Sequence, residues 1–99
     1  MKRGVDYKEG LIKRLGDHVY AAHYLNAALE DTDSASNIRF LIALRDVAIA
    51  NGVTNLARKT KLGRESLYKT LSKAGNPTFL TLISILNAIG LKLAIKKAA

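Results

Sequence analysis

The chain has 99 residues and contains no cysteine, no tryptophan and a single proline. The absence of cysteine excludes disulfide bonds and thiolate metal sites. No apolar run approaches the roughly 18 to 20 residues of a membrane span, and the first residues, MKRGVDYKEG, lack the apolar stretch of a secretion signal. We therefore expect a cytoplasmic protein with one small domain and no membrane partner.

Acidic residues are scarce in the second half of the chain. Residues 54–76 hold six basic side chains and one acidic side chain, Glu65, and three further lysines follow in the C-terminal tail. Residues 1–53 hold seven of each sign, so the net charge of +8 belongs to the second half. Neutralising DNA phosphates requires a local excess of positive charge of this kind.

Hydrophobic periodicity predicts a mainly all-α protein of about five to six helices. Gly16 and Gly52 are suitable helix stops, and Asp17 and Thr78 are suitable N-caps. In the last helix, Phe79, Leu80 and Ile85 add apolar surface beyond the amount that packing within one chain needs, which suggests a subunit contact. We expect a single domain over 1–99, divided into an N-terminal helical extension (1–33), a core (34–90) and a C-terminal strand or tail (91–99).

The stretch from Thr54 to Gly75 predicts two short helices and a tight turn. Thr54 is a suitable N-cap for the first helix, and the second, RESLYKTLSK, places Leu67 and Leu71 on its inner face. Its other side is polar. Such a pair matches the helix-turn-helix motif, whose second helix lies in the major groove of DNA. The alternative interpretation is an amphipathic pair that only packs a small core, and the basic charge of the stretch argues against it.

The C-terminal tail, LKLAIKK, alternates apolar and mostly basic residues. This period of two predicts a strand, with Leu91, Leu93 and Ile95 on one side. A strand needs a partner for its backbone groups, and the chain offers no second candidate strand. We expect it to pair across a two-fold axis with another copy, or with an edge strand of a different protein. A frayed basic tail is the alternative.

The segment LARKTKLGRESLYKTLSKAGNPTFLTLISILNAIGLKL resembles the Cro/phage-repressor (XRE-type) helix-turn-helix, and more closely the HigA-like addiction-module antidote proteins, or antitoxins. The likeness runs from Tyr24 to Lys96 and leaves residues 1–20 outside. It implies a lambda-repressor-like domain and a homodimeric repressor that binds a palindromic double-stranded DNA operator. It also implies a partner, a small basic toxin of the RelE/HigB type. Lys61 departs from the wider pattern, because glycine is common at that turn position.

Carried over by position, the resemblance implies base contacts by Arg64, Glu65 and Lys69 and a phosphate contact by Thr54. Arg64 can donate to guanine O6 and N7, and Glu65 can accept from cytosine N4. Glu65 is equally explained as an acid that stabilises the first helical turn, and Lys69 suits a base or a phosphate. The residues expected to bind phosphate or fix the register are Asn55, Lys61, Ser66, Tyr68, Ser72 and Lys73.

Other functions receive less support from the sequence. The toxin-contacting candidates are Tyr20, Tyr24 and the acidic cluster from Glu30 to Asp33, and a stand-alone regulator without a toxin is the alternative function. An enzyme is not expected, because the chain has no cysteine nucleophile, phosphate-binding glycine loop or paired catalytic groups. We expect no cofactor and no metal. A reader of single-stranded RNA would need an aromatic stacking platform that the chain lacks.

Overall fold

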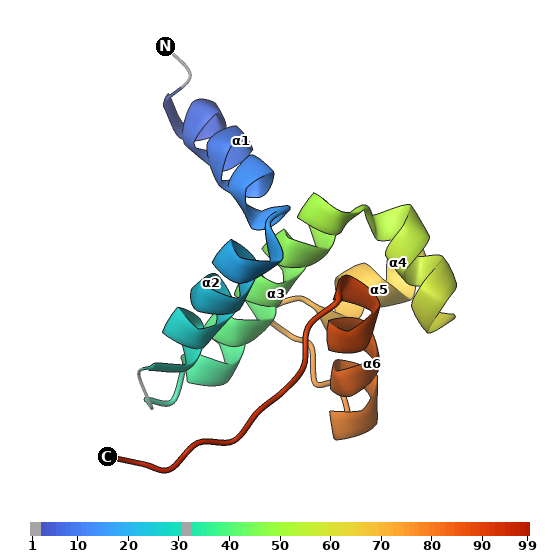
Figure 1. Cartoon of the computed structure of the whole chain (residues 1–99). Coiled ribbons are helices and arrows are strands. Elements are labelled where there is room, and N and C mark those ends of the chain that lie inside the picture. Colours follow the sequence, from blue (N-terminus) through green and yellow to red (C-terminus); the bar gives the residue numbers. More distant parts are fainter. Residues whose placement is uncertain (1–2, 31–32) are drawn as a thin grey trace.

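The computed structural model describes residues 3–30 and 33–99, with side chains from Tyr7 onward. This part of the chain forms six helices, so the mainly all-α architecture is confirmed (Figure 1). The helices are α1 (Arg3–Leu15), α2 (His18–Glu30), α3 (Ser36–Asn51), α4 (Val53–Thr60), α5 (Arg64–Thr70) and α6 (Phe79–Ile89). The acidic cluster predicted after α2 includes residues 31 and 32, which lie outside the described part.

The central helix is α3, which packs against α1, α2, α4 and α6 (Figure 1). The helix is apolar around much of its circumference, and it is therefore covered by other helices on more than one side. Phe40, Leu44 and Val47 of α3 belong to one continuous core, which also includes Leu15 of α1 and Ile85 of α6. The N-terminal helices thus cover one side of α3, and the later helices cover another.

Asp46 is a buried acid in this apolar helix, with only 5% of its surface exposed. Its two carboxylate oxygens accept separate hydrogen bonds, one from Lys8 Nζ of α1 and one from the Tyr24 hydroxyl of α2, each 2.9 Å long. Burial raises the pKa of Tyr24 to about 12, and the hydrogen bond to Asp46 adds to the effect. A single carboxylate therefore ties α1 and α2 to α3.

Two of the predicted N-caps are confirmed, and a third is wrong. Asp17 Oδ1 accepts from the Val19 N–H at the start of α2, Thr78 Oγ1 accepts from the Thr81 N–H at the start of α6, and Gly90 ends α6 in the left-handed region. Thr54 is not an N-cap, because α4 begins at Val53 and Gly52, two residues before Thr54, occupies the cap position. Thr54 lies exposed in the first turn instead.

The apolar surface of α6 only partly follows the prediction. Ile85 is fully buried, so the expectation that it is surplus is wrong. It faces the core together with Leu86 and Ile89 in the second half of α6, whereas Phe79 is the first residue of the helix. Phe79 and Leu80 are 65% and 77% exposed, so they do remain apolar surface without cover in the single chain.

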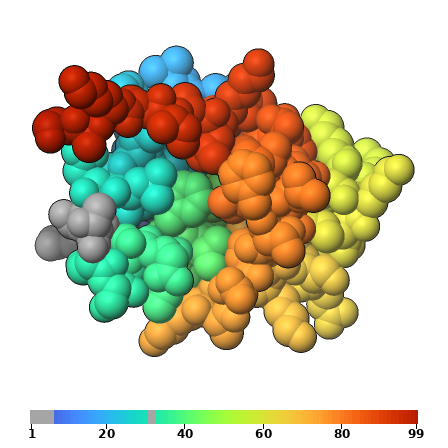
Figure 2. Space-filling model, turned by 90° about the horizontal axis from the view of Figure 1, so that it is seen from below, coloured from blue at the N-terminus to red at the C-terminus, as the bar shows by residue number. Residues whose placement is uncertain are grey.

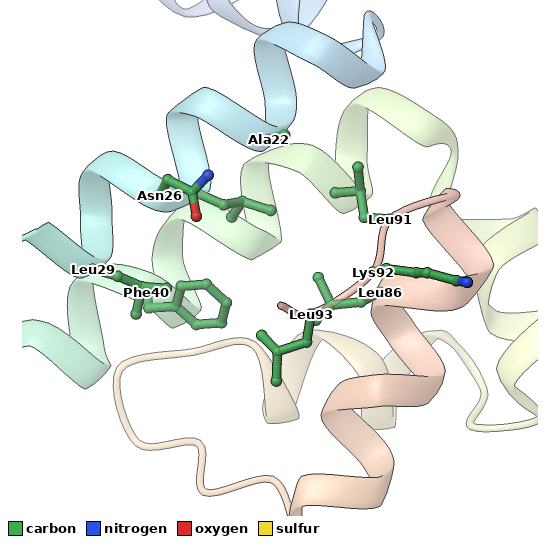
Figure 3. Close-up of a pocket in the computed structure, with 9 residues that line it drawn as sticks. Ala22, Asn26, Leu29, Phe40, Leu86, Leu91, Lys92 and Leu93 are labelled. Atoms are coloured by element: carbon green, nitrogen blue, oxygen red, sulfur yellow. The ribbon is translucent and has the colours of Figure 1, made fainter. Parts of the chain in front are cut away.

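The tail, residues 91–99, has no regular secondary structure, so the predicted strand is not formed in the single chain. Its first residues lie along α2: Leu91, Lys92 and Leu93 line a cavity of about 70 Å³ together with Asn26 and Leu29 (Figure 3). The Leu91 N–H donates to the Leu86 carbonyl, and no later backbone group bonds to another described backbone group. A strand needs a second strand, and the described residues provide none.

No single described helix is long and apolar enough to span a membrane. Only α3 and α4 together reach such a length and composition, and they are bent by 105° at Gly52, with α3 at the centre of the core.

Candidate nucleic-acid interface

The helices α4 and α5 are joined by residues 61–63, and their inner faces are buried. Leu56 and Ala57 of α4 and Leu67 of α5 belong to the core, as does Leu71, which follows α5 directly. The described α5 is shorter than predicted, because it ends at Thr70 and not near Lys73. Leu71 leaves the helical conformation with φ −97° and ψ 45°, yet its side chain keeps the buried position that the periodicity predicts.

The turn between the helices is made by Lys61, which caps the end of α4. Its backbone lies in the left-handed region with φ 61° and ψ 23°, the only positive φ of a non-glycine residue in the described chain. This conformation costs a lysine on the order of 1 kcal/mol, because Cβ approaches the following carbonyl. The lysine side chain is exposed to solvent at the junction of the two helices.

The outer side of α5 is polar and uncovered. Arg64, Glu65, Ser66 and Lys69 are all exposed while Leu67 is buried, so the helix is anchored on one face and free on the other. Neither Arg64 nor Lys69 forms an ion pair with a described residue. Their positive charges are therefore available to an external anion.

Positive charge also surrounds α5. The exposed cations on the neighbouring segments are Arg58, Lys59, Lys61 and Lys73. The nearest opposing acid in sequence, Glu65, is the only one from residue 47 to the end of the chain. A surface with this charge suits a polyanion.

The remaining predicted contacts are placed less uniformly. Thr54 is exposed, and Asn55 is exposed but accepts a 3.3 Å hydrogen bond from Arg58 Nη1. The Ser72 hydroxyl donates to the Lys69 carbonyl at 2.7 Å, so it also serves to close the last turn of α5. Tyr68 is half-buried against the core.

One contact beside α5 was missed by the sequence analysis. The guanidinium carbon of Arg45, on α3, lies 5.4 Å from the centroid of the Tyr68 ring, within the range of a cation–π interaction. Arg45 is exposed although its neighbours Leu44 and Asp46 are buried. The sequence carried a signal for it, because Arg45 and Asp46 are the two charged residues in the otherwise apolar run from Phe40 to Ala50.

Among the described toxin-contacting candidates, Tyr20, Tyr24 and Glu30 lie on α2, and Asp33 precedes α3 and pairs with Arg39. Tyr20 is partly exposed, and its hydroxyl accepts from Arg14 Nε at 3.3 Å while the Arg14 guanidinium lies over its ring. The Tyr24 hydroxyl donates a hydrogen bond to Asp46, so this residue has a structural role. Glu30 is exposed at the end of α2.

Comparison with known proteins adds a family to this geometry. Residues 8–97 match the family described as "Probable addiction module antidote protein". An "Uncharacterized protein" from Haemophilus influenzae is 37% identical over 76 residues, which cover 76% of this chain and 74% of the relative. No solved structure matches the chain. The family match begins within α1, so it includes most of the N-terminal region that the sequence resemblance left outside.

Proposed function

This chain belongs to the family of probable addiction module antidote proteins, and we propose that it is the DNA-binding antitoxin of such a module. In this proposal α4 and α5 form a helix-turn-helix of the XRE type, α5 lies in the major groove of an operator, and the bound protein represses transcription. The same chain binds and neutralises a small toxin, for which the RelE/HigB type is the best candidate. The family membership favours this function over that of a stand-alone regulator.

One observation carries the DNA-binding part. Buried Leu67 and Leu71 fix the inner side of α5, which leaves an uncovered polar side with two cations that have no ion pair among the described residues. A helix with side chains is about 10–12 Å across, which fits a major groove about 12 Å wide. Only the outer side of α5 then faces the base edges.

The roles follow from position and chemistry. Arg64 and Lys69 can donate to base edges or phosphates, and Glu65 can accept from a cytosine amino group. Lys61, in the turn before α5, and Lys73, in the segment after it, suit the phosphates. Thr54, Asn55, Ser66, Tyr68 and Ser72 complete the proposed DNA-contacting set.

Arg64→Ala tests the base-reading role. Duplexes taken from the DNA upstream of the protein's own reading frame serve as operator probes, and an unrelated duplex of equal length serves as the reference. We expect the variant to lose about 1 to 3 kcal/mol of discrimination between the two, measured by fluorescence anisotropy. Lys59→Ala removes one charge from an exposed α4 position, and we expect it to lower both affinities evenly.

The result that counts against DNA reading is equally specific. If the wild-type protein binds operator and reference duplexes alike, α5 reads no sequence. If Arg64→Ala weakens both equally, Arg64 contacts phosphate and not bases.

The toxin-binding part rests on the family and on a separate surface. Figure 2 shows the tail along one edge of the molecule, with α4 and the segment after it along other edges. Glu30 of α2 is exposed beside the tail, since Ala94 and Lys96 line a cavity with it, and Tyr20 is exposed on the same helix next to Arg14 of α1. Co-expression with the product of the neighbouring reading frame, followed by co-purification, tests for a toxin. Tyr20→Ala is expected to reduce the recovered complex if α2 contacts it.

A further inference from the structure

Arg45 occupies an unusual place on α3. It is exposed in a stretch where Leu44, Asp46, Val47 and Ala48 are buried. Its side chain extends to α5, where the guanidinium carbon lies over the ring of Tyr68. It lies outside the two helices of the DNA-binding motif, in the helix before them.

The charge of Arg45 has no carboxylate partner among the described residues. Arg39, on the same helix, instead pairs with Asp33 at 3.1 Å. The cation–π contact with Tyr68 engages no acceptor atom, and the Arg45 guanidinium makes no hydrogen bond to a described residue, so its N–H donors remain free for an external acceptor. A planar, oriented cation of this kind is well suited to a phosphate group.

Tyr68 places this cation at the side of α5. At about 100° per residue, Tyr68 is about 60° around the helix from the buried Leu71 and about 60° from the outward-facing Glu65. A helix that faces base edges with its outer side has the DNA backbones along its flanks. Arg45 is therefore next to the flank of α5 that a phosphate strand would follow.

We infer that Arg45 binds a DNA phosphate beside the major groove and that the Tyr68 ring holds its guanidinium in place. The inference rests on the proposed DNA-binding function and extends the interface beyond α4 and α5 to α3. Tyr68 then acts as a positioning residue for Arg45, in addition to any contact its own hydroxyl makes.

Salt dependence of DNA binding tests the inference, because each neutralised phosphate contributes about 0.9 to the slope of log K against log salt. Arg45→Ala and Arg45→Gln are compared with wild type on the upstream duplex and on an unrelated duplex, between about 50 and 200 mM salt. We expect both variants to bind each duplex about tenfold more weakly and to reduce the slope by about 0.9.

Arg39→Ala is the matched control, since it removes the same charge from the same helix at a position paired with Asp33. We expect its slope to equal that of wild type. Tyr68→Leu keeps Arg45 but removes the ring, and it is expected to weaken binding while leaving part of the slope. Circular dichroism of each variant confirms that the helices are retained.

Two outcomes overturn the inference while the proposed function stands. One is that the wild-type protein binds the upstream duplex and both Arg45 variants show the same slope of log K against log salt as wild type. The other is an equal slope change in Arg39→Ala, which would show a general charge effect. Failure of the wild-type protein to bind either duplex would instead reject the proposed function.

Discussion

Among single side chains, Asp46 has the most demanding environment. A buried carboxylate needs hydrogen-bond donors, and Lys8 and Tyr24 supply one for each oxygen at 2.9 Å. The Lys8 side chain remains 56% exposed, so the ammonium keeps contact with water while it reaches the buried oxygen. The arrangement fixes the helices α1 and α2 against α3 by a polar contact that apolar packing alone would not orient.

Tyr24→Phe is expected to lower the free energy of unfolding at neutral pH by about 1 to 2 kcal/mol, because it removes a hydrogen bond to a charged group. The pKa of Tyr24 is raised from 10.0 to about 12, so the folded state keeps a proton that the unfolded state loses. This stabilisation is complete below pH 10 and is lost as pH rises toward 12. Thermal unfolding measured at about pH 8 and about pH 11 should therefore show that wild type loses more stability between the two pH values than Tyr24→Phe does.

Tyr20→Phe provides the control for that experiment, because its ring lies on the same helix but its hydroxyl contacts Arg14. We expect it to follow the wild-type pH dependence. An equal loss of stability between the two pH values in wild type and Tyr24→Phe would contradict the linkage to Tyr24.

Among the helices and turns, the junction of α4 and α5 carries a lysine, Lys61, where the backbone conformation favours glycine. The backbone of Lys61 has φ 61°, a region in which glycine carries no steric cost. The side chain, however, places a cation between the two helices of the proposed DNA-binding motif. A lysine at this position is consistent with a functional gain that offsets local strain.

Lys61→Gly is expected to raise the free energy of unfolding by up to about 1 kcal/mol, because the left-handed turn no longer carries a Cβ. The same variant should bind operator and unrelated DNA more weakly to an equal extent, with a salt slope smaller by about 0.9. Thermal unfolding and anisotropy titrations measure the two effects.

Lys61→Ala separates them, since it removes the charge but keeps Cβ. We expect it to match Lys61→Gly in DNA binding without the gain in stability. A Lys61→Gly protein less stable than Lys61→Ala would show that the turn is not strained.

The sequence predicts the helices better than their ends. Periodicity identifies the buried side of α5 through Leu67 and Leu71, and the caps Asp17 and Thr78 have a side-chain oxygen in the required place. Thr54 has the same chemistry, but Gly52, with a positive φ of 89°, takes the cap position two residues earlier. The residue at which α4 begins depends on how α4 packs against α3 and α6. The local sequence pattern holds no information on that packing.

Contacts between helices distant in sequence were the least predictable part of the candidate site. The polar outer side of α5 follows from spacing alone, whereas Arg45 reaches Tyr68 only because α3 and α5 meet in space. Asp46 likewise depends on Lys8, which is 38 residues away. Periodicity assigns a residue to a face of its own helix, but it does not identify the residue that the face meets.

In the protein as a unit, both the tail and α6 carry apolar side chains that the described residues leave uncovered, and each of these surfaces suggests a different dimer. Ile95 in the tail is 91% exposed, and Leu80 on α6 is 77% exposed. Antiparallel pairing of two tails centred on Leu93 would place Leu91 opposite Ile95 and Lys92 opposite Ala94. A centre at Ala94 would place Lys92 opposite Lys96, and like charges directly opposite are unfavourable. The first register is therefore the one that we propose for the dimer.

Ile95→Glu tests this dimer without disturbing the fold, because the side chain has almost no contacts within its own chain. In the proposed register the introduced carboxylate would meet Leu91 of the other copy, so sedimentation should show a shift to monomer and binding to a palindromic duplex should weaken. Deleting residues 91–99 should have the same effect but also removes the half-buried Leu91. Leu80→Glu is the matched control: if it alone yields a monomer, the subunits meet through α6 and the tail has another role.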